Sequence, residues 1–277
     1  MRAGAAPLGF ARYRKGAHCL IVDTGFADAV RRLGLLERGV LEDLIRQASV
    51  GGGRAPNAVV PLPGRPERLH LRPFQHGGLL GGLGGDRLFG LGRPLSELHV
   101  SARLRAAGAP VARPLLVAGR RRAGPLWRAV VGTLHEEAAI DGGAFLAARP
   151  DAGRLLRAAR VTGAAVRRVH EAGGRHADLH IGNILLRERG AATEALLVDF
   201  DRARVGERPG PRARMAEIMR LYRSLLKRDL LETLGAAGCR AFLAGYTGSD
   251  RSLRRALLRH LPRERRRIAV HRLGYGR

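Results

Sequence analysis

The first half of the chain carries the hydrophobic pattern of β-strands. Apolar residues there alternate with polar ones or form short runs bounded by Gly, Pro or Asn, and both patterns are typical of strands. In residues 68–74 (RLHLRPF), Leu69 and Leu71 point to one face of the predicted strand, and His70 and Arg72 point to the other. Strands are predicted over residues 17–24, 57–62, 68–74, 110–119 and 126–134.

Helical periodicity dominates the second half. Residues 151–172 repeat apolar positions at helical spacing, and Gly173-Gly174 ends this predicted helix. Residues 194–205 (EALLVDFDRARV) form a buried strand with acidic residues at its end, and the chain after residue 212 is mostly helical. Two helical stretches are also predicted in the first half, over residues 26–49 with breaks at Gly34 and Gly39, and over residues 94–108.

This division predicts an α+β fold with two lobes, a small β-rich N-terminal lobe and a mostly helical C-terminal lobe. The joint between them is expected near residues 133–143. We expect residues 1–50 to be an extension that packs on the N-terminal lobe, residues 51–135 to form that lobe, and residues 136–277 to form the C-terminal lobe. A chain of 277 residues can bury one large core or two modest ones.

The chain is strongly basic, with a formal net charge of +26 at pH 7. Such a charge is a common signature of nucleic-acid-binding proteins. Every basic residue except Lys15 and Lys227 is an arginine, however, and the arginines are spread along the whole chain. Because no single basic block stands out, this distribution argues against a dedicated nucleic-acid role. The charge still favours anionic partners, such as phosphates or acidic lipid headgroups.

The chain is expected to remain in the cytoplasm. Basic residues interrupt any apolar run near the N-terminus, so the signature of a signal peptide is missing. No stretch approaches the ~20 apolar residues of a membrane-spanning helix. Cys19 and Cys239 are far apart and are expected to be reduced. The basic segment 254–267 is expected to be a solvated helix, with an interfacial helix on a membrane as the alternative.

Residues 175–186 (RHADLHIGNILL) concentrate polar side chains in front of an apolar segment. His176 and His180 have the spacing of two metal ligands on one face of a helix. The flanking Gly173-Gly174 and Gly182 favour a loop instead, and no third nitrogen or sulfur ligand is near in the sequence. A zinc site is therefore the weaker interpretation.

The stronger interpretation joins this loop to the strand that follows it. Asp178 and Asn183 stand in the order H-x-D-L-x-x-x-N, and Asp199 follows at the end of an apolar strand. Protein-kinase-like phosphotransferases arrange their catalytic loop and metal-binding aspartate in this way. Phosphoryl transfer needs a carboxylate that orients the acceptor hydroxyl and takes its proton, which we expect of Asp178. It also needs hard oxygen ligands for the Mg²⁺ of ATP, which we expect of Asn183 and Asp199.

A kinase-like chain needs three further features upstream. Gly51, Gly52 and Gly53 precede two predicted strands, as a loop that covers the phosphates would. Neither lysine lies on the expected phosphate-binding strand, so Arg72 is the candidate cation, since a guanidinium can bind phosphate oxygens bidentately. Glu97, in the helix that follows, is expected to pair with Arg72. The alternatives are a solvated strand residue for Arg72 and an exposed helix charge for Glu97.

Two other side chains of the motif have open roles. His180 stands where protein kinases carry a lysine near the γ-phosphate, and we expect it to bind the transferred phosphoryl group or to steady the loop. A purely structural hydrogen bond is an equal alternative. Asp201 could bind metal, but an ion pair with Arg202 or Arg204 is the simpler interpretation.

Four segments together resemble the bacterial lipopolysaccharide inner-core kinases. The double glycine of the first segment and the DFD of the last, in place of DFG, are the more specific parts. The segments are LRPFQHGGLLG (71–81), PLSELHVSARLRAAGAPVARPL (94–115), HADLHIGNILL (176–186) and LLVDFDRAR (196–204).

The resemblance implies a bilobal protein-kinase-like fold and a phosphotransferase that uses ATP and Mg²⁺. Its acceptor would be a sugar hydroxyl on a lipid A precursor, with 3-deoxy-D-manno-octulosonic acid (Kdo) favoured over a core heptose. Such a lipid-linked acceptor lies at the cytoplasmic face of the inner membrane, so peripheral contact with that anionic surface is expected. The basic surplus fits an acceptor that carries carboxylates and phosphates.

Two alternative functions stay open. The chain lacks the long segment ending in Ala-Pro-Glu with which protein kinases dock peptides, and this favours a non-protein acceptor. The loop motif is shared with aminoglycoside and choline phosphotransferases, so a kinase of soluble small molecules is the first alternative. The second is a non-catalytic pseudokinase that binds anions or nucleic acid.

Overall fold

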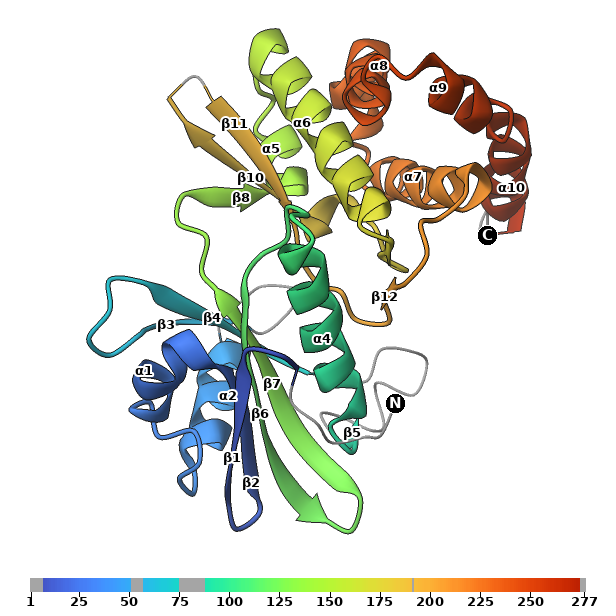
Figure 1. The fold of residues 1–277 in the computed structure, drawn as a ribbon. Helices are drawn as coiled ribbons and strands as arrows, with labels where there is room; N and C mark the ends of the chain where they lie inside the picture. Colours follow the sequence, from blue (N-terminus) through green and yellow to red (C-terminus); the bar gives the residue numbers. More distant parts are fainter. Residues whose placement is uncertain (1–6, 51–56, 75–87, 191, 275–277) are drawn as a thin grey trace. The chain divides into compact units, whose positions relative to one another are not determined.

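The computed structural model describes residues 7–50, 57–74, 88–190 and 192–274, and the chain divides into two compact units (Figure 1). The first unit contains residues 1–102 and 112–136, and the second contains 103–111 and 137–277. A large sheet characterises the first unit, and helices dominate the second. The predicted α+β class is confirmed.

Within the described part of the first unit, seven strands form one antiparallel sheet in the order β1-β2-β6-β7-β4-β3, with β5 paired to β7. Strand β1, in the first 50 residues, was not predicted, because its basic residues Arg12, Arg14 and Lys15 hide the alternation of a strand at the sheet edge. The strands are β1 (Phe10–Lys15), β2 (His18–Asp23), β3 (Ala58–Pro61), β4 (Arg68–Pro73), β5 (Leu88–Phe89), β6 (Pro114–Ala123) and β7 (Leu126–Leu134).

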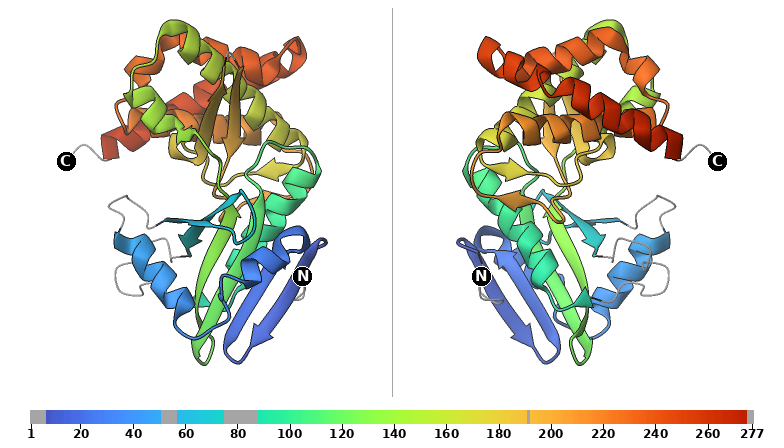
Figure 2. Two further views of the ribbon diagram at one scale, coloured as in Figure 1. Left: turned by 90° about the vertical axis from the view of Figure 1, so that its left-hand side faces the viewer. Right: turned by 90° about the vertical axis from the view of Figure 1, so that its right-hand side faces the viewer.

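Helices cover both faces of this sheet (Figure 2). Alternate residues of the strands enter two separate apolar cores, as the period of two in a strand requires. One core includes α1 (Ala27–Arg31) and α2 (Val40–Val50), and the other includes α4 (Gly92–Ala106). Gly34 and Gly39 adopt positive φ angles of 71° and 91° between α1 and α2, as expected for helix breaks.

The second unit contains a small sheet with the order β11-β10-β8. It consists of β8 (Ala139–Asp141), β10 (Ile184–Arg189) and β11 (Ala192–Leu197). A separate short pair joins β9 (Gly174–Arg175) to β12 (Arg204–Val205). The strand predicted over residues 194–205 therefore ends at Leu197, and the acidic residues after it leave the sheet.

Two glycines allow the helices α6 and α8 of the second unit to pack closely. A methyl group on Gly163 or Gly245 would collide with the backbone carbonyl oxygen of Phe242 or Arg160, respectively. The Asp151 side chain accepts a 2.9 Å hydrogen bond from the backbone N–H of Arg154 and caps α6. The helices of this unit are α5 (Gly142–Ala147), α6 (Ala152–Glu171), α7 (Pro211–Leu226), α8 (Leu231–Thr247), α9 (Arg251–Leu258) and α10 (Leu261–Gly274).

Within the described ranges, no helix combines the length and apolar character needed to cross a membrane.

Candidate functional site

In the first unit, Arg72 and Glu97 form a partly buried ion pair. The Arg72 Nη2 atom donates to both carboxylate oxygens of Glu97, each at 2.8 Å. The two side chains come from β4 and α4, and the Glu97 side chain is only 6% exposed. The structure thus contains the pair that the sequence predicts, and Leu69 and Leu71 lie in the apolar core on the other face of the strand.

The neighbouring His70 adds no charge to this pair at neutral pH. Burial lowers its pKa to about 4, and the nearby His135 and Arg72 act in the same direction. The cations of this strand face are therefore the guanidiniums of Arg68 and Arg72. The predicted glycine loop, Gly51 to Gly53, lies outside the described residues.

In the second unit, the predicted catalytic loop connects β9 to β10. Asp178 is exposed, whereas the next residue, Leu179, is fully buried and holds the loop against the unit. Asn183 ends a short 3₁₀ helix (Ile181–Asn183) and is buried. Its Nδ2 atom donates to the backbone oxygen of Asp178 at 3.1 Å. This bond fixes the amide orientation and leaves Oδ1 as the atom that can bind a cation.

The β10–β11 hairpin brings Asp199 to the same end as this loop. Ile184 lies opposite Leu197 in the antiparallel register, and the Val198 N–H donates to the backbone oxygen of Asn183 at 3.0 Å. Asn183 and Asp199 therefore flank the same end of the hairpin, although they are far apart in sequence. Asp199 has a φ angle of 61°, a left-handed conformation that aspartate tolerates better than most residues.

His176 ties the loop to the segment around Asp199. Its Nε2 atom donates to the backbone oxygen of Val198 at 2.9 Å, and the centroids of the His176 and Phe200 rings are 4.7 Å apart. Burial lowers the pKa of His176, which favours the neutral ring. No group of three or more His, Cys, Asp or Glu side chains placed to hold a metal occurs in the described part of the chain.

His180 lies in the electric field of both proposed site carboxylates. Burial lowers the pKa of this half-buried imidazole, and Arg228 acts in the same direction. Asp178, Asp199 and Asp141 act in the opposite direction. The carboxylates at 178 and 199 thus both act to raise the pKa of one imidazole ring.

The sequence analysis missed Glu217, which supports the loop from α7. Its Oε2 atom accepts from the His176 backbone N–H at 3.0 Å and lies 3.3 Å from His170 Nε2. Leu221, one helical turn after Glu217, is buried. Ser224, two turns after Glu217, accepts a hydrogen bond from the Ile181 backbone N–H through its Oγ atom at 2.9 Å. The sequence held one signal for this role: Glu217 is an acidic residue on the same helical face as Leu221 and Ser224, which point into the unit.

We expect Glu217→Gln to lower the free energy of unfolding by about 2 kcal/mol at pH 7, because hydrogen bonds to a buried charged acceptor weaken. Burial raises the pKa of the Glu217 carboxyl, but hydrogen bonds from the His170 side chain and the His176 backbone N–H outweigh burial and hold it below 4.5. The stabilisation is therefore present above about pH 4.5 and lost as the pH falls through the folded-state pKa.

Urea unfolding from pH 7 to pH 3 measures this effect. Wild type should lose more stability toward low pH than Glu217→Gln, and the exposed control Glu207→Gln should behave as wild type. Equal unfolding free energies for the two variants at pH 7 would show that Glu217 does not support the loop.

The second unit offers hard oxygen donors that suit magnesium. The Asn183 Oδ1 atom and the Asp199 carboxylate lie at one end of the hairpin, and such amide and carboxylate oxygens are typical Mg²⁺ ligands. The donor set therefore fits the cation that a kinase-like chain would use.

The comparisons with known proteins agree with this layout. The family model of the lipopolysaccharide kinase (Kdo/WaaP) family matches residues 67–246. A 3-deoxy-D-manno-octulosonic acid kinase of Mannheimia succiniciproducens is 32% identical over 161 residues, which are 57% of this chain and 65% of that protein. A protein of the same name from Xylella fastidiosa (strain 9a5c) is 34% identical over 57% of this chain and 61% of its own length. The match thus spans less than two thirds of these relatives.

The similarity to solved structures concerns the fold. The structure described as WaaP in complex with acyl carrier protein superimposes with a TM-score of 0.57 and 19% identity, covering 90% of this chain and 97% of that chain. This confirms the predicted kinase-like fold. Because the family model covers well over half of its residues, the chain belongs to the lipopolysaccharide kinase (Kdo/WaaP) family.

Proposed function

We propose that the chain is an ATP-dependent phosphotransferase that acts on a sugar hydroxyl of the lipopolysaccharide inner core. Kdo on a lipid A precursor is the favoured acceptor, since the relatives above are named 3-deoxy-D-manno-octulosonic acid kinases. One observation supports the activity most strongly: hydrogen bonds join the Asp178–Asn183 loop to the hairpin end that carries Asp199.

In the proposed reaction, the acceptor hydroxyl oxygen forms a bond to the γ-phosphorus of ATP, and the bond from that phosphorus to the β–γ bridging oxygen breaks. Asp178 orients the hydroxyl and takes its proton; its exposure leaves the carboxylate accessible to a large acceptor. Asn183 and Asp199 would hold Mg²⁺, which when bound neutralises phosphate charge. His180 and the Arg72–Glu97 pair would bind and order the phosphates, and Gly51, Gly52 and Gly53 would cover them.

Arg72→Lys tests the role of the fork-shaped cation. We expect kcat/KM for ATP to fall about tenfold, because an ammonium cannot hold both Glu97 oxygens and a phosphate with fixed geometry. Steady-state kinetics with varied ATP measure this, and Arg128→Lys on the same sheet is the control. Unchanged kinetics in Arg72→Lys would mean that the guanidinium geometry is unimportant.

The acceptor is identified with γ-labelled ATP, magnesium and a panel of candidates. The panel contains a Kdo-bearing lipid A precursor, a heptose-bearing one, an aminoglycoside and choline. Label is expected in the Kdo-bearing glycolipid. Label only in a small soluble alcohol would favour the first alternative, and salt-sensitive oligonucleotide binding without any ATP turnover would favour the second.

We also propose that the chain works at the cytoplasmic face of the inner membrane, where a lipid-linked acceptor lies. The formal charge of +26 supports peripheral attraction to anionic lipids.

A further inference from the structure

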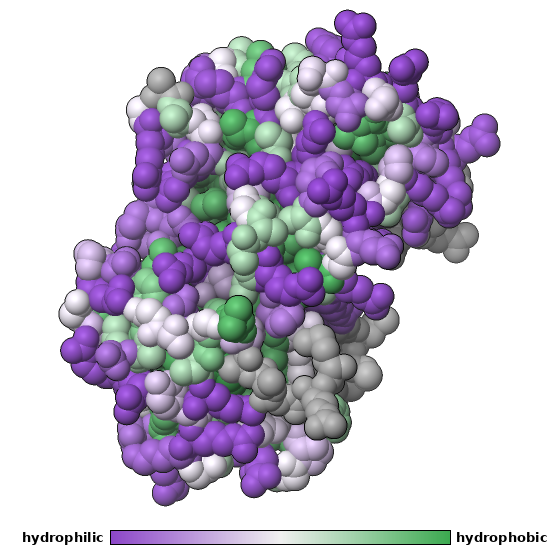
Figure 3. Space-filling model, viewed as in Figure 1, coloured by the Kyte–Doolittle hydropathy of each residue, from purple (hydrophilic) through white to green (hydrophobic). Residues whose placement is uncertain are grey.

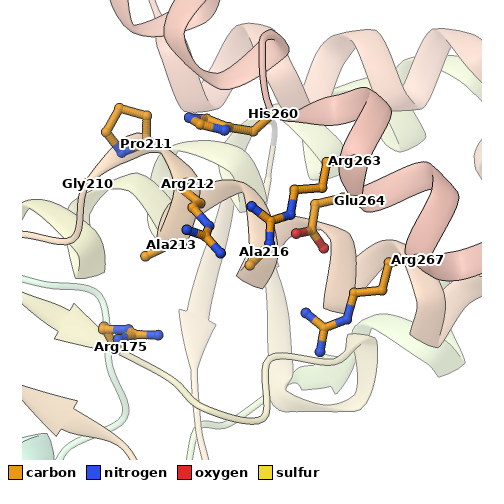
Figure 4. A pocket seen from close by; sticks show the side chains of 10 residues that line it. All are labelled: Arg175, Gly210, Pro211, Arg212, Ala213, Ala216, His260, Arg263, Glu264 and Arg267. Atoms are coloured by element: carbon orange, nitrogen blue, oxygen red, sulfur yellow. The ribbon is translucent and has the colours of Figure 1, made fainter.

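A cavity of about 800 Å³ in the second unit has four arginines among the ten residues that line it (Figure 4). Arg175 comes from β9, Arg212 from α7, and Arg263 and Arg267 from α10. The guanidinium groups of Arg212 and Arg263 point into the same space between α7 and α10 in Figure 4. A cavity of this size can hold a sugar-sized ligand.

The charges of this lining are not balanced. Of the described residues that line the cavity, Glu264 alone is acidic, against four arginines. Arg175 lies 3.5 Å from Glu217, but Arg212, Arg263 and Arg267 make no ion pair within the described residues. Other arginines of this unit are paired: Arg154 with Glu188 at 2.6 Å, for example. A gathering of unpaired guanidiniums in a concave site favours an anionic ligand.

The backbone adds to this preference. Gly210 precedes α7 without a side-chain cap, and Pro211 occupies its first turn. Arg212 and Ala213, whose N–H groups belong to the unsatisfied first turn of a 16-residue helix, both line the cavity. The pKa of the nearby Arg223 is lowered by burial and by repulsion from Arg220 and Arg267, which shows a positive potential on this side. In Figure 3, hydrophilic residues cover most of the surface over α9 and α10.

Arg175 connects the cavity to the proposed acceptor loop, because it stands three positions before Asp178. A group held in the cavity and a hydroxyl at Asp178 would therefore contact the same short segment. We infer that the cavity is an anion subsite that binds a phosphate monoester carried by the sugar acceptor, apart from the hydroxyl that is phosphorylated. This inference rests on the proposed function. Guanidiniums and helix N-termini suit the tetrahedral oxygens of a phosphate.

The test measures binding rather than turnover. Calorimetry with the full chain, in saturating MgADP so that the nucleotide site is filled, uses glucosamine 1-phosphate, glucosamine, inorganic phosphate and phosphatidylglycerol vesicles. The double variant Arg212→Ala/Arg263→Ala removes two cavity cations. The control Arg251→Ala/Arg254→Ala removes the same charge from exposed positions of α9 outside the cavity.

Wild type and control should bind glucosamine 1-phosphate but not glucosamine, and the cavity variant should bind it at least about tenfold more weakly. Equal affinity in the cavity variant would overturn the inference. If the cavity variant loses affinity only for the vesicles, these arginines belong to a membrane-binding surface instead. If wild type binds inorganic phosphate as tightly as glucosamine 1-phosphate, the arginines form a site for free phosphate. Either result contradicts an acceptor subsite.

The two proposals fail separately. Normal transfer of label from ATP together with unchanged binding in the cavity variant would remove only the subsite. Binding that depends on Arg212 and Arg263 in a chain that transfers no label would remove the kinase function and leave the cavity as an anion-binding site without an acceptor role.

Discussion

Asp178→Asn is expected to lower turnover by about 10²–10⁴-fold, while ATP binding stays nearly unchanged. The reason is that the carboxylate takes the proton of the acceptor hydroxyl, which an amide cannot do. The loop should keep its conformation, because the Asp178 groups that bind its neighbours are in the backbone: its oxygen accepts from Asn183 Nδ2, and its N–H donates to the His176 oxygen at 2.7 Å.

Labelled-phosphate transfer to the acceptor, together with nucleotide binding by calorimetry, measures both parts of this prediction. Asp229→Asn is the matched control, since Asp229 is an exposed aspartate in the same unit. Turnover within a few-fold of wild type in Asp178→Asn would remove this residue from the mechanism.

Asp199→Asn is expected to cost about 10³-fold in kcat/KM at low magnesium, because the amide has lost the charge that holds the cation. Asparagine tolerates the φ angle of 61° at this position, so the substitution should preserve the backbone and isolate the effect of charge. Higher magnesium should restore part of the activity. Kinetics at several magnesium concentrations measure this, and activity that is unchanged and independent of magnesium would contradict the proposed role.

Asp201→Asn in the same series resolves the open role of the second aspartate of the DFD sequence. An ion-pair residue should retain most of the activity at every magnesium concentration. A loss that magnesium partly restores would add Asp201 to the proposed metal ligands.

Local pattern was sufficient to predict most elements of the fold. Strand β7 (Leu126–Leu134) coincides with the predicted strand. Helix α6 (Ala152–Glu171) begins and ends within one residue of the predicted helix, because a capping aspartate and a glycine mark its ends. Strand β1 was missed, since an edge strand exposed to solvent carries charged residues and weak alternation.

The candidate site shows where sequence reasoning succeeds and where it stops. Arg72 and Glu97 could be paired in advance, because alternation in the strand assigned Arg72 to the face opposite Leu69 and Leu71, and a kinase-like layout requires a glutamate in the helix that follows. Glu217 could not be assigned to the loop, since its contact with the His176 N–H depends on how α7 packs under residues 41 positions earlier. Long-range packing of this kind leaves only a weak signal in one sequence.

The arginine cavity illustrates the same limit. The pattern of segment 254–267 predicts a solvated helix, because a basic run usually faces water. Only the fold brings Arg263 and Arg267 to the N-terminus of α7 and to Arg175, which are more than 50 residues away. The sequence predicted the charge but not its concentration in one place.

The proposed phosphoryl transfer depends most on Asp199 and Asn183, which would hold one divalent cation together with the nucleotide. Electron paramagnetic resonance of Mn²⁺ in the presence of a non-hydrolysable ATP analogue tests this directly and requires no acceptor. Wild type and Asp178→Asn should bind one nucleotide-dependent Mn²⁺ per chain, and Asp199→Asn should bind it at least about tenfold more weakly. Equal Mn²⁺ affinity in all three proteins would contradict a cation site that contains Asp199.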